Sequence, residues 1–117
     1  MLPKPLKLTK NKEFDQVFSA GKAAYTDFVG VKCVKNSLEI SRFGILTSVK
    51  VSKKATVRNK IKRRIRQVLL AEMDILKPGY DCAVICRPAI AEKKYQEIET
   101  NLRHLFARLK LYKKAAR

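Results

Sequence analysis

Hydrophobic side chains recur at helical spacing in three stretches of this chain: residues 11–20, about 55–75 and about 92–111. In each stretch, apolar residues stand three and four positions apart, which places them on one face of a helix. Gly21 follows the first stretch and a Pro-Gly pair follows the second, so both helices end where continuation is disfavoured. The pattern therefore predicts three amphipathic helices.

The stretches between these helices show strand patterns. Residues 27–35 and 41–51 alternate between the two faces of a strand, and the turn-forming sequence between them predicts an antiparallel hairpin. A short extended segment at 23–26 precedes the hairpin. Residues 80–88 are nearly continuously apolar, which is typical of a strand in a sheet interior. The element order predicts the α+β class: a two-layer αβ sandwich with helices packed on a small sheet.

The chain carries a large excess of positive charge. Lysine and arginine number 27 against 10 acidic residues, for a formal net charge of +17 over 117 residues. Hydrophobic residues make up 46% of the chain, enough for the core of one domain. We expect a single domain over residues 1–117, with a basic tail at about 112–117. Self-repulsion at this charge opposes compaction, so the expected partner is a polyanion, and nucleic acid is favoured over a membrane surface.

The cysteines and the N-terminus bear on the compartment. The first residues lack a signal-peptide core, and no run is long enough to span a bilayer. Cys33, Cys82 and Cys86 are an odd number with no CxxC pair, which is typical of a reducing compartment, so we expect a cytoplasmic protein with no membrane partner. With His104 they make four potential zinc ligands, but the short knuckle of zinc sites is absent. Buried cysteines on strands are the favoured interpretation, and we expect no metal ligands.

The second predicted helix concentrates the charge. Residues 53–70 hold eight cationic side chains and no acidic one. An apolar stripe formed by Val57, Ile61, Ile65 and Val68 is expected to face the sheet. The far side is expected to carry Asn59, Arg63 and Arg66 with Lys62 beside them, and the flanks Arg58, Lys60 and Arg64.

This charge has two interpretations. A charged helix face is usually a solvated surface, but such faces normally mix signs. Like charges four positions apart cost about 0.2–0.5 kcal/mol each, and no acidic residue between Lys50 and Arg66 relieves them. A phosphate-binding helix is therefore favoured, in which arginines offer bidentate forks and lysines offer point charges. Asn59 adds no charge, and we interpret it as a directional donor and acceptor.

Four stretches of the chain resemble the bacterial ribonuclease P protein family. RNKIKRRIRQ, residues 58–67, is similar to the Arg-Asn block that opens the family's central helix. LTKNKEFDQVFSAGK resembles the opening helix, RFGILTSVK the strand before the basic loop, and LRHLFARLKLYKK the closing helix. The likeness runs in order along nearly the whole chain. The family usually has a glycine just before the central helix, where this chain has KVSKKATVRN, so the conformation of residues 52–55 stays open.

The resemblance implies a parallel strand–helix–strand unit with a rare left-handed crossover, within a small mixed sheet. It also implies an endoribonuclease subunit without catalytic residues, whose partner RNA removes the 5′ leader of precursor tRNA with Mg²⁺ that the RNA mainly binds. Ribonuclease P RNA and precursor tRNA are the expected partners, and DNA is not. The residues expected to contact the catalytic RNA are Lys53, Lys54, Arg58, Asn59, Lys60, Lys62, Arg63, Arg64 and Arg66.

The resemblance further implies a cleft between the first helix and the sheet that holds the single-stranded leader. Single strands are commonly bound by aromatic platforms lined with cations. From periodicity alone Phe14 and Phe18 are more simply core, but with the resemblance we expect one to be packed and one to lie partly in the cleft. Phe28 and Val31 are expected to point to opposite faces of their strand, so that only one forms the floor. The expected leader contacts are Lys10, Lys12, Phe14, Phe18, Phe28 and Val31.

Three other functions fit the sequence less well. An enzyme in its own right needs catalytic groups, and this chain has one histidine, scattered acids and no phosphate-binding glycine loop. A helix-turn-helix repressor needs a short helix just before residue 55, where the pattern predicts a strand. A ribosomal-type or general RNA-chaperone protein shares the charge and the compactness, and only the ordered motif match argues against it.

Overall fold

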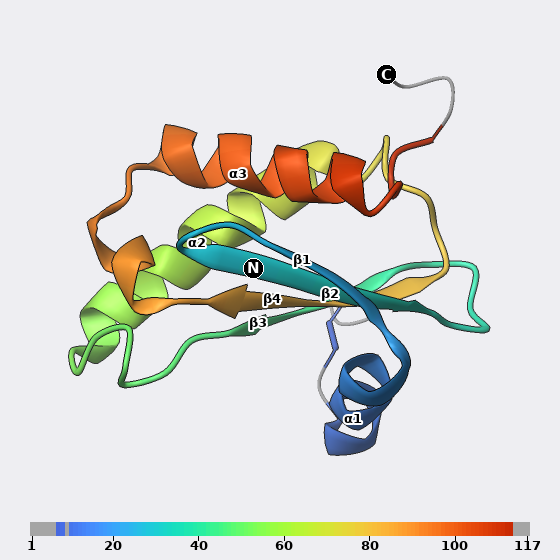
Figure 1. Ribbon diagram of the computed structural model, residues 1–117, viewed down its shortest axis with the longest axis horizontal. Helices are drawn as coiled ribbons and strands as arrows, with labels where there is room; N and C mark the ends of the chain where they lie inside the picture. Colours follow the sequence, from blue (N-terminus) through green and yellow to red (C-terminus); the bar gives the residue numbers. More distant parts are fainter. Residues whose placement is uncertain (1–6, 9, 114–117) are drawn as a thin grey trace.

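The computed structural model describes residues 7–8 and 10–113 (Figure 1). Three helices and four strands follow one another in the predicted order, with one short 3₁₀ helix added. In chain order the elements are α1 (Asn11–Ala20), β1 (Lys22–Tyr25), β2 (Val29–Lys35), β3 (Arg42–Leu46), α2 (Ala55–Glu72), β4 (Tyr80–Cys86), η2 (Pro88–Glu92) and α3 (Tyr95–Arg108).

The four strands form one mixed sheet in the order β1-β2-β4-β3. β2 pairs with β4 antiparallel, and β3 pairs with β4 in parallel. The expected hairpin between the second and third strands is therefore wrong, because β4 lies between them. Four consecutive residues of β4, 81–84, are buried, and a strand covered on both faces belongs in the interior of a sheet.

The unit β3–α2–β4 is the parallel strand–helix–strand crossover that the resemblance implies. Parallel neighbours need such a connection because the chain must return to the same end of the sheet. At that end, the amide of Asn36 donates to the carbonyl of Gly79 at 2.8 Å, where the link from β2 to β3 passes the start of β4. The left hand of the crossover stays an expectation of the resemblance.

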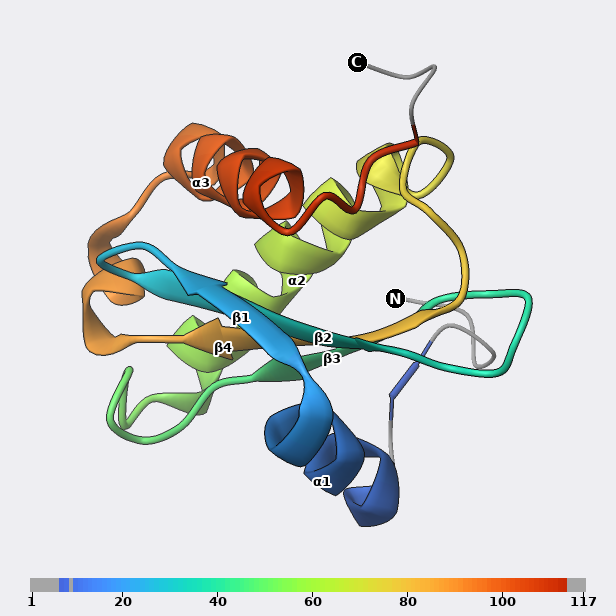
Figure 2. The ribbon, with the colours of Figure 1, turned by 45° about the vertical axis from the view of Figure 1, so that its right-hand side comes forward.

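Helices cover the two faces of the sheet unequally (Figures 1 and 2). α2 and α3 lie on one face and form the predicted two-layer sandwich with the sheet, while α1 lies on the opposite face. The main core fills the space between the sheet, α2 and α3, and a small cluster of Leu8, Val17 and Ala83 lies under α1. Fully buried side chains of the main core include Val29, Val31, Val84, Ile65, Leu69, Ile98, Leu102, Leu105 and Phe106.

Several elements are shorter than predicted. β3 ends at Leu46, and residues 47–54 form a loop instead of extending the strand. α2 ends at Glu72, since residues 73–75 form a turn. α3 spans 14 residues, because the separate helix η2 takes up residues at its predicted start.

The C-terminal segment packs onto the end of α2. Leu111 is buried, and the Tyr112 hydroxyl donates to the Glu72 carboxylate at 2.5 Å. The Lys113 ammonium donates to the Asp74 carbonyl at 2.9 Å. Residues 112–113 of the expected basic tail are therefore packed against the fold, and residues 114–117 lie outside the described part of the chain.

Candidate RNA-binding surfaces

The nine residues predicted to contact the catalytic RNA lie together on α2 and the loop before it; we name them the α2 basic surface. The first turn of α2 has no acidic residue, so the positive end of the helix dipole adds to their charge. Lys53, Lys54, Asn59, Lys60 and Arg63 are exposed, whereas Arg58, Lys62, Arg64 and Arg66 are half-buried.

The cations of the α2 basic surface form no ion pair with any residue in the described part of the chain. The ion pairs of that part are made by Arg42, Lys93 and Arg103. Exposed cations such as Lys60 and Arg63 therefore keep their full charge for an external anion. Phosphate oxygens are the acceptors that best match guanidinium and ammonium donors.

Two arginines of this surface also hold neighbouring segments in place. Arg58 donates to the Ser52 carbonyl at 2.7 Å, and Arg64 donates to the Lys93 carbonyl at 2.8 Å. The amide of Lys54 donates to the Ser52 hydroxyl at 3.2 Å, and the side chain of Val51 in the same loop is buried. These contacts define the loop conformation that the sequence left open and present its two lysines beside the start of α2.

Lys62 and Arg66 do not lie where the helical wheel predicted them. Both are half-buried and line a cavity of about 130 Å³ beside β3, together with Lys7, Gly44 and other residues. The buried stripe of α2 includes Leu69, which the prediction omitted. With Leu69 among the buried residues, the face of α2 that packs on the sheet is centred closer to Lys62 and Arg66, and these two side chains lie toward the edge of the sheet.

α1 lies on the sheet through an aromatic contact. A Cβ atom added to Gly44 of β3 would lie 2.4 Å from the Phe14 ring, so this ring occupies the space that a larger residue would fill. Phe18 is 40% exposed, and the Lys32 ammonium lies 5.7 Å from its ring centroid. Phe14 is half-buried and Phe18 is exposed, and the contact of either ring with RNA stays a prediction.

A second aromatic group, not predicted from the sequence, lies on the same face of the sheet. Tyr25 of β1 pairs with Gly30 of β2, and its ring lies 2.2 Å from where a Gly30 Cβ would stand. Tyr25 is 40% exposed, and the Arg87 guanidinium lies 4.7 Å from its ring centroid. A glycine inside a valine-rich strand was the available signal, since it often marks a close approach of another group to the backbone. We name Phe18, Tyr25, Gly30, Lys32 and Arg87 the aromatic surface.

Phe28 and Val31 do not lie in a cleft beside α1. Phe28 is 5% exposed and Val31 is fully buried, and both belong to the main core on the side of α2 and α3. Phe28 precedes the first residue of β2 in a bend, so strand alternation does not set its direction. The Lys93 ammonium covers its ring at 5.2 Å from the centroid. The prediction that one of the two forms the cleft floor is therefore wrong.

A network of charges fixes α1 over the strands. Arg42 donates to Asp81 at 2.9 and 2.7 Å and to Glu13 of α1 at 2.5 Å, and hydrogen bonding to Asp81 raises the pKa of the guanidinium. Lys12 lines a cavity of about 560 Å³ beside this network. Lys10 is exposed at the N-terminal cap of α1 and Lys12 lies in its first turn, so both predicted lysines are at the start of this helix.

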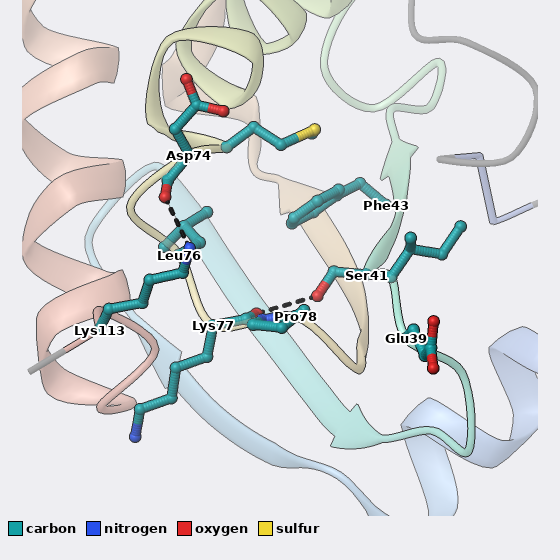
Figure 3. Close-up of a pocket in the computed structure, with 10 residues that line it drawn as sticks. Glu39, Ser41, Phe43, Asp74, Leu76, Lys77, Pro78 and Lys113 are labelled. Carbon is teal, nitrogen blue, oxygen red and sulfur yellow. Dashed lines mark hydrogen bonds between the residues drawn. The ribbon is translucent and has the colours of Figure 1, made fainter.

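Another cavity, of about 210 Å³, lies between the start of β3 and the end of α2 (Figure 3). The Ser41 hydroxyl donates to the Lys77 carbonyl at 3.0 Å on one side, and Lys113 contacts Asp74 on the other. Its lining mixes both signs of charge and includes no residue of the α2 basic surface or the aromatic surface.

The described residues hold few groups suited to other chemistry. His104 is exposed in the middle of α3. Among residues 7–8 and 10–113, no three His, Cys, Asp or Glu side chains gather closely enough to hold a metal ion. None of the helices in this same part of the chain combines the length and hydropathy needed to cross a membrane.

Comparison with known proteins places the sequence in a family. A family model described as Ribonuclease P matches residues 2–110. The ribonuclease P protein component of a Cyanothece species is 36% identical over 92% of this chain and 94% of the relative. The Bacillus velezensis component is 36% identical over 94% of each chain.

Solved structures agree with the sequence comparison. The chain superposes on a Staphylococcus aureus ribonuclease P protein mutant, described as defective in mRNA degradation, with a TM-score of 0.87, 27% identity and coverage of 93% and 92% of the two chains. The Thermotoga maritima ribonuclease P protein gives a TM-score of 0.79 and 28% identity over 87% of this chain and 96% of that chain. The fold, the charge on α2 and these relatives agree: the chain belongs to the ribonuclease P protein components, the protein subunits of a tRNA-processing endoribonuclease.

Proposed function

We propose that this protein acts in the cytoplasm and binds two RNA segments on two separate surfaces. The α2 basic surface binds the catalytic RNA of ribonuclease P. The aromatic surface, together with α1, binds the single-stranded 5′ leader of precursor tRNA. The two surfaces lie on different elements, so one chain can contact both RNAs in the same complex.

The unneutralised charge of α2 is the observation that carries the proposal. In the described part of the chain its cations lack acidic partners, and the first turn of the helix adds its dipole. Binding of such a surface to RNA releases condensed counterions, which provides a favourable, salt-dependent term for each phosphate contacted. Arg58 and Arg64 contribute mainly by holding the loop and η2 in position.

Two half-exposed rings support the assignment of the leader to the aromatic surface. Phe18 and Tyr25 each lie beside a cation, Lys32 and Arg87 respectively. Unpaired bases stack on such rings, while the neighbouring cations attract the backbone phosphates. Gly30 has no side chain, so the Tyr25 ring can lie directly on the β2 backbone.

We assign the hydrolytic chemistry to the partner RNA and its Mg²⁺. When bound by that RNA, Mg²⁺ supplies an activated water and stabilises the leaving oxygen. The residues of this chain bind and orient: α2 fixes the protein on the catalytic RNA, and the aromatic surface aligns the leader. Their charge also lowers phosphate repulsion, which reduces the Mg²⁺ concentration that the complex needs.

A salt series tests the proposal. The affinity of the protein for a cognate ribonuclease P RNA is measured from low to high salt for the wild type and for a Lys60→Ala, Arg63→Ala double variant. Both residues are exposed and lie outside the buried stripe, so we expect the fold to survive. The slope of log K against log salt should flatten by about one to two units.

A second double variant controls for net charge. Arg108→Ala with Lys110→Asn removes two exposed cations from the end of α3, and Asn suits the positive φ of 57° at position 110. This variant should keep the wild-type slope. Equal flattening in both double variants would mean that total charge, and not the α2 basic surface, binds the RNA.

A further inference from the structure

Two of the three cysteines face each other across neighbouring strands. Cys33 of β2 is directly opposite Cys82 of β4 in the antiparallel register. At one end of the β2–β4 ladder the backbone amide of Arg87 donates to the carbonyl of Phe28. At the other end the backbone amide of Asn36 donates to the carbonyl of Gly79. Ladder bonds recur at every second residue, so Cys33 and Cys82 form a non-hydrogen-bonded pair.

This type of pair has a geometry that suits a disulfide. Cα atoms of a non-hydrogen-bonded antiparallel pair are about 4.5 Å apart, and their side chains project to the same face. Disulfides span Cα separations of about 4.4–6.8 Å. A bond between the two sulfurs therefore needs no rearrangement of the sheet.

Cys33 can be reached by a small molecule although it is only 4% exposed. It lines a cavity of about 260 Å³ between the end of α1 and the C-terminal end of α3. Lys22 and Lys35 line the same cavity and give it a positive potential. Cys82, at 1% exposed, lies behind Cys33 and does not line the cavity.

The three thiols differ in their ionisation. A hydrogen bond with Cys82, aided by the charge of Lys22, lowers the pKa of Cys33 below its ordinary value against the effect of burial. The hydrogen bond with Cys33, together with burial, raises the pKa of Cys82. Burial raises the pKa of Cys86 to about 12. Cys33 is thus the thiol with most thiolate character, and the thiolate is the nucleophile.

We propose that Cys33 and Cys82 are a peroxide-reactive thiol pair that closes to a cross-strand disulfide, a modification separate from RNA binding. The oxidant is a hydroperoxide, with hydrogen peroxide as the simplest member. The Cys33 thiolate attacks one peroxide oxygen and the O–O bond breaks, which yields Cys33 sulfenic acid and hydroxide. The Cys82 sulfur, losing its proton, then attacks the Cys33 sulfur. The S–O bond breaks, water leaves, and two thiols have been oxidised by one peroxide.

The test exposes the purified, folded full-length protein to hydrogen peroxide and counts thiols under denaturing conditions. We expect the count to fall from three to one, with a mass loss of two hydrogens. Proteolysis without reductant should give one linked peptide pair containing residues 33 and 82. The bond closes a loop that includes β3 and α2, so the melting temperature should rise on the order of 10 °C and return to its starting value after reduction.

Two variants sharpen the test. Cys86→Ala should form the same bond at the same rate. Cys82→Ser keeps a hydroxyl donor beside Cys33 but has no thiol, so this variant should stop at the sulfenic acid, trapped at Cys33 by dimedone. The proposal is overturned if all three thiols survive a peroxide exposure that oxidises free cysteine, or if the wild-type linkage joins Cys86 or two separate chains. If a variant fails to fold, the peptide map of the oxidised wild-type protein still shows whether residues 33 and 82 are linked.

Discussion

Arg42 holds the carboxylate of Asp81 with two parallel hydrogen bonds, 2.9 Å from its Nε and 2.7 Å from its Nη2. Asp81 is 4% exposed on central strand β4, and Asn36 also donates to it at 2.8 Å. The remaining Arg42 nitrogen reaches Glu13 of α1. One guanidinium therefore joins β3, β4 and α1, and it sets the position of the helix that carries Phe14 and Phe18.

Replacement of Arg42 by Met should lower the free energy of unfolding by roughly 3–5 kcal/mol, because the buried Asp81 carboxylate loses its charged partner. Chemical denaturation measures this. Lys93→Met is the matched control: its ion pair with Glu97 is long, at 3.8 Å, and partly exposed, so removal should cost about 1 kcal/mol or less. Equal losses in both variants would contradict a special role for the Arg42 network.

Gly44→Ala should displace Phe14, since the new Cβ would lie 2.4 Å from the Phe14 ring. We expect a stability loss of about 1–3 kcal/mol from overpacking, together with weaker leader binding as α1 shifts. Phe14→Leu, added in the same chain, should recover part of the stability by removing the ring atoms that clash. Purely additive losses in this double-mutant cycle would show that the two residues are not coupled.

Phe18→Ala and Tyr25→Ala should each weaken binding of leader-bearing precursor tRNA by about 1–3 kcal/mol, since a stacking surface is lost. Affinity for mature tRNA and the salt slope toward the catalytic RNA should stay nearly unchanged. The Lys60→Ala, Arg63→Ala variant should instead flatten the salt slope toward the catalytic RNA and keep its preference for leader-bearing over mature tRNA. Leu38→Ala, at a residue 44% exposed in the link between β2 and β3, serves as the control. Loss of catalytic-RNA binding in a folded Tyr25 variant would refute the assignment of two surfaces.

The purified chain alone should cleave no precursor tRNA at any Mg²⁺ concentration, because we assign the chemistry to the partner RNA. Added to that RNA, it should lower the Mg²⁺ needed for half-maximal cleavage and favour precursor over mature tRNA. Cleavage assays across a Mg²⁺ series measure both effects. Site-specific cleavage by rigorously RNA-free protein would disprove this division of labour.

Local patterns in the sequence were enough for the elements and for the α2 basic surface. Helical spacing identified α1, α2 and α3, and the order of strands and helices followed directly. The stretch around Lys60 and Arg63 was identifiable because its charge and its lack of acids are properties of neighbouring residues. The predicted orientation of side chains on α2 was less accurate. The buried stripe also includes Leu69, and Lys62 and Arg66 lie toward the edge of the sheet.

Contacts between distant residues depended on the tertiary structure. Sequence periodicity carries no information on which strand lies beside which, so the hairpin was predicted where β4 lies between β2 and β3. The register of the sheet places Tyr25 over Gly30 and Cys33 opposite Cys82, and the packing brings Arg87 to the Tyr25 ring. The amino-acid sequence by itself determines the excess of positive charge that favours RNA and the apolar helix and strand faces that form the core. Strand order, which depends on burial of the most apolar strand and on the crossover through α2, decided which side chains meet.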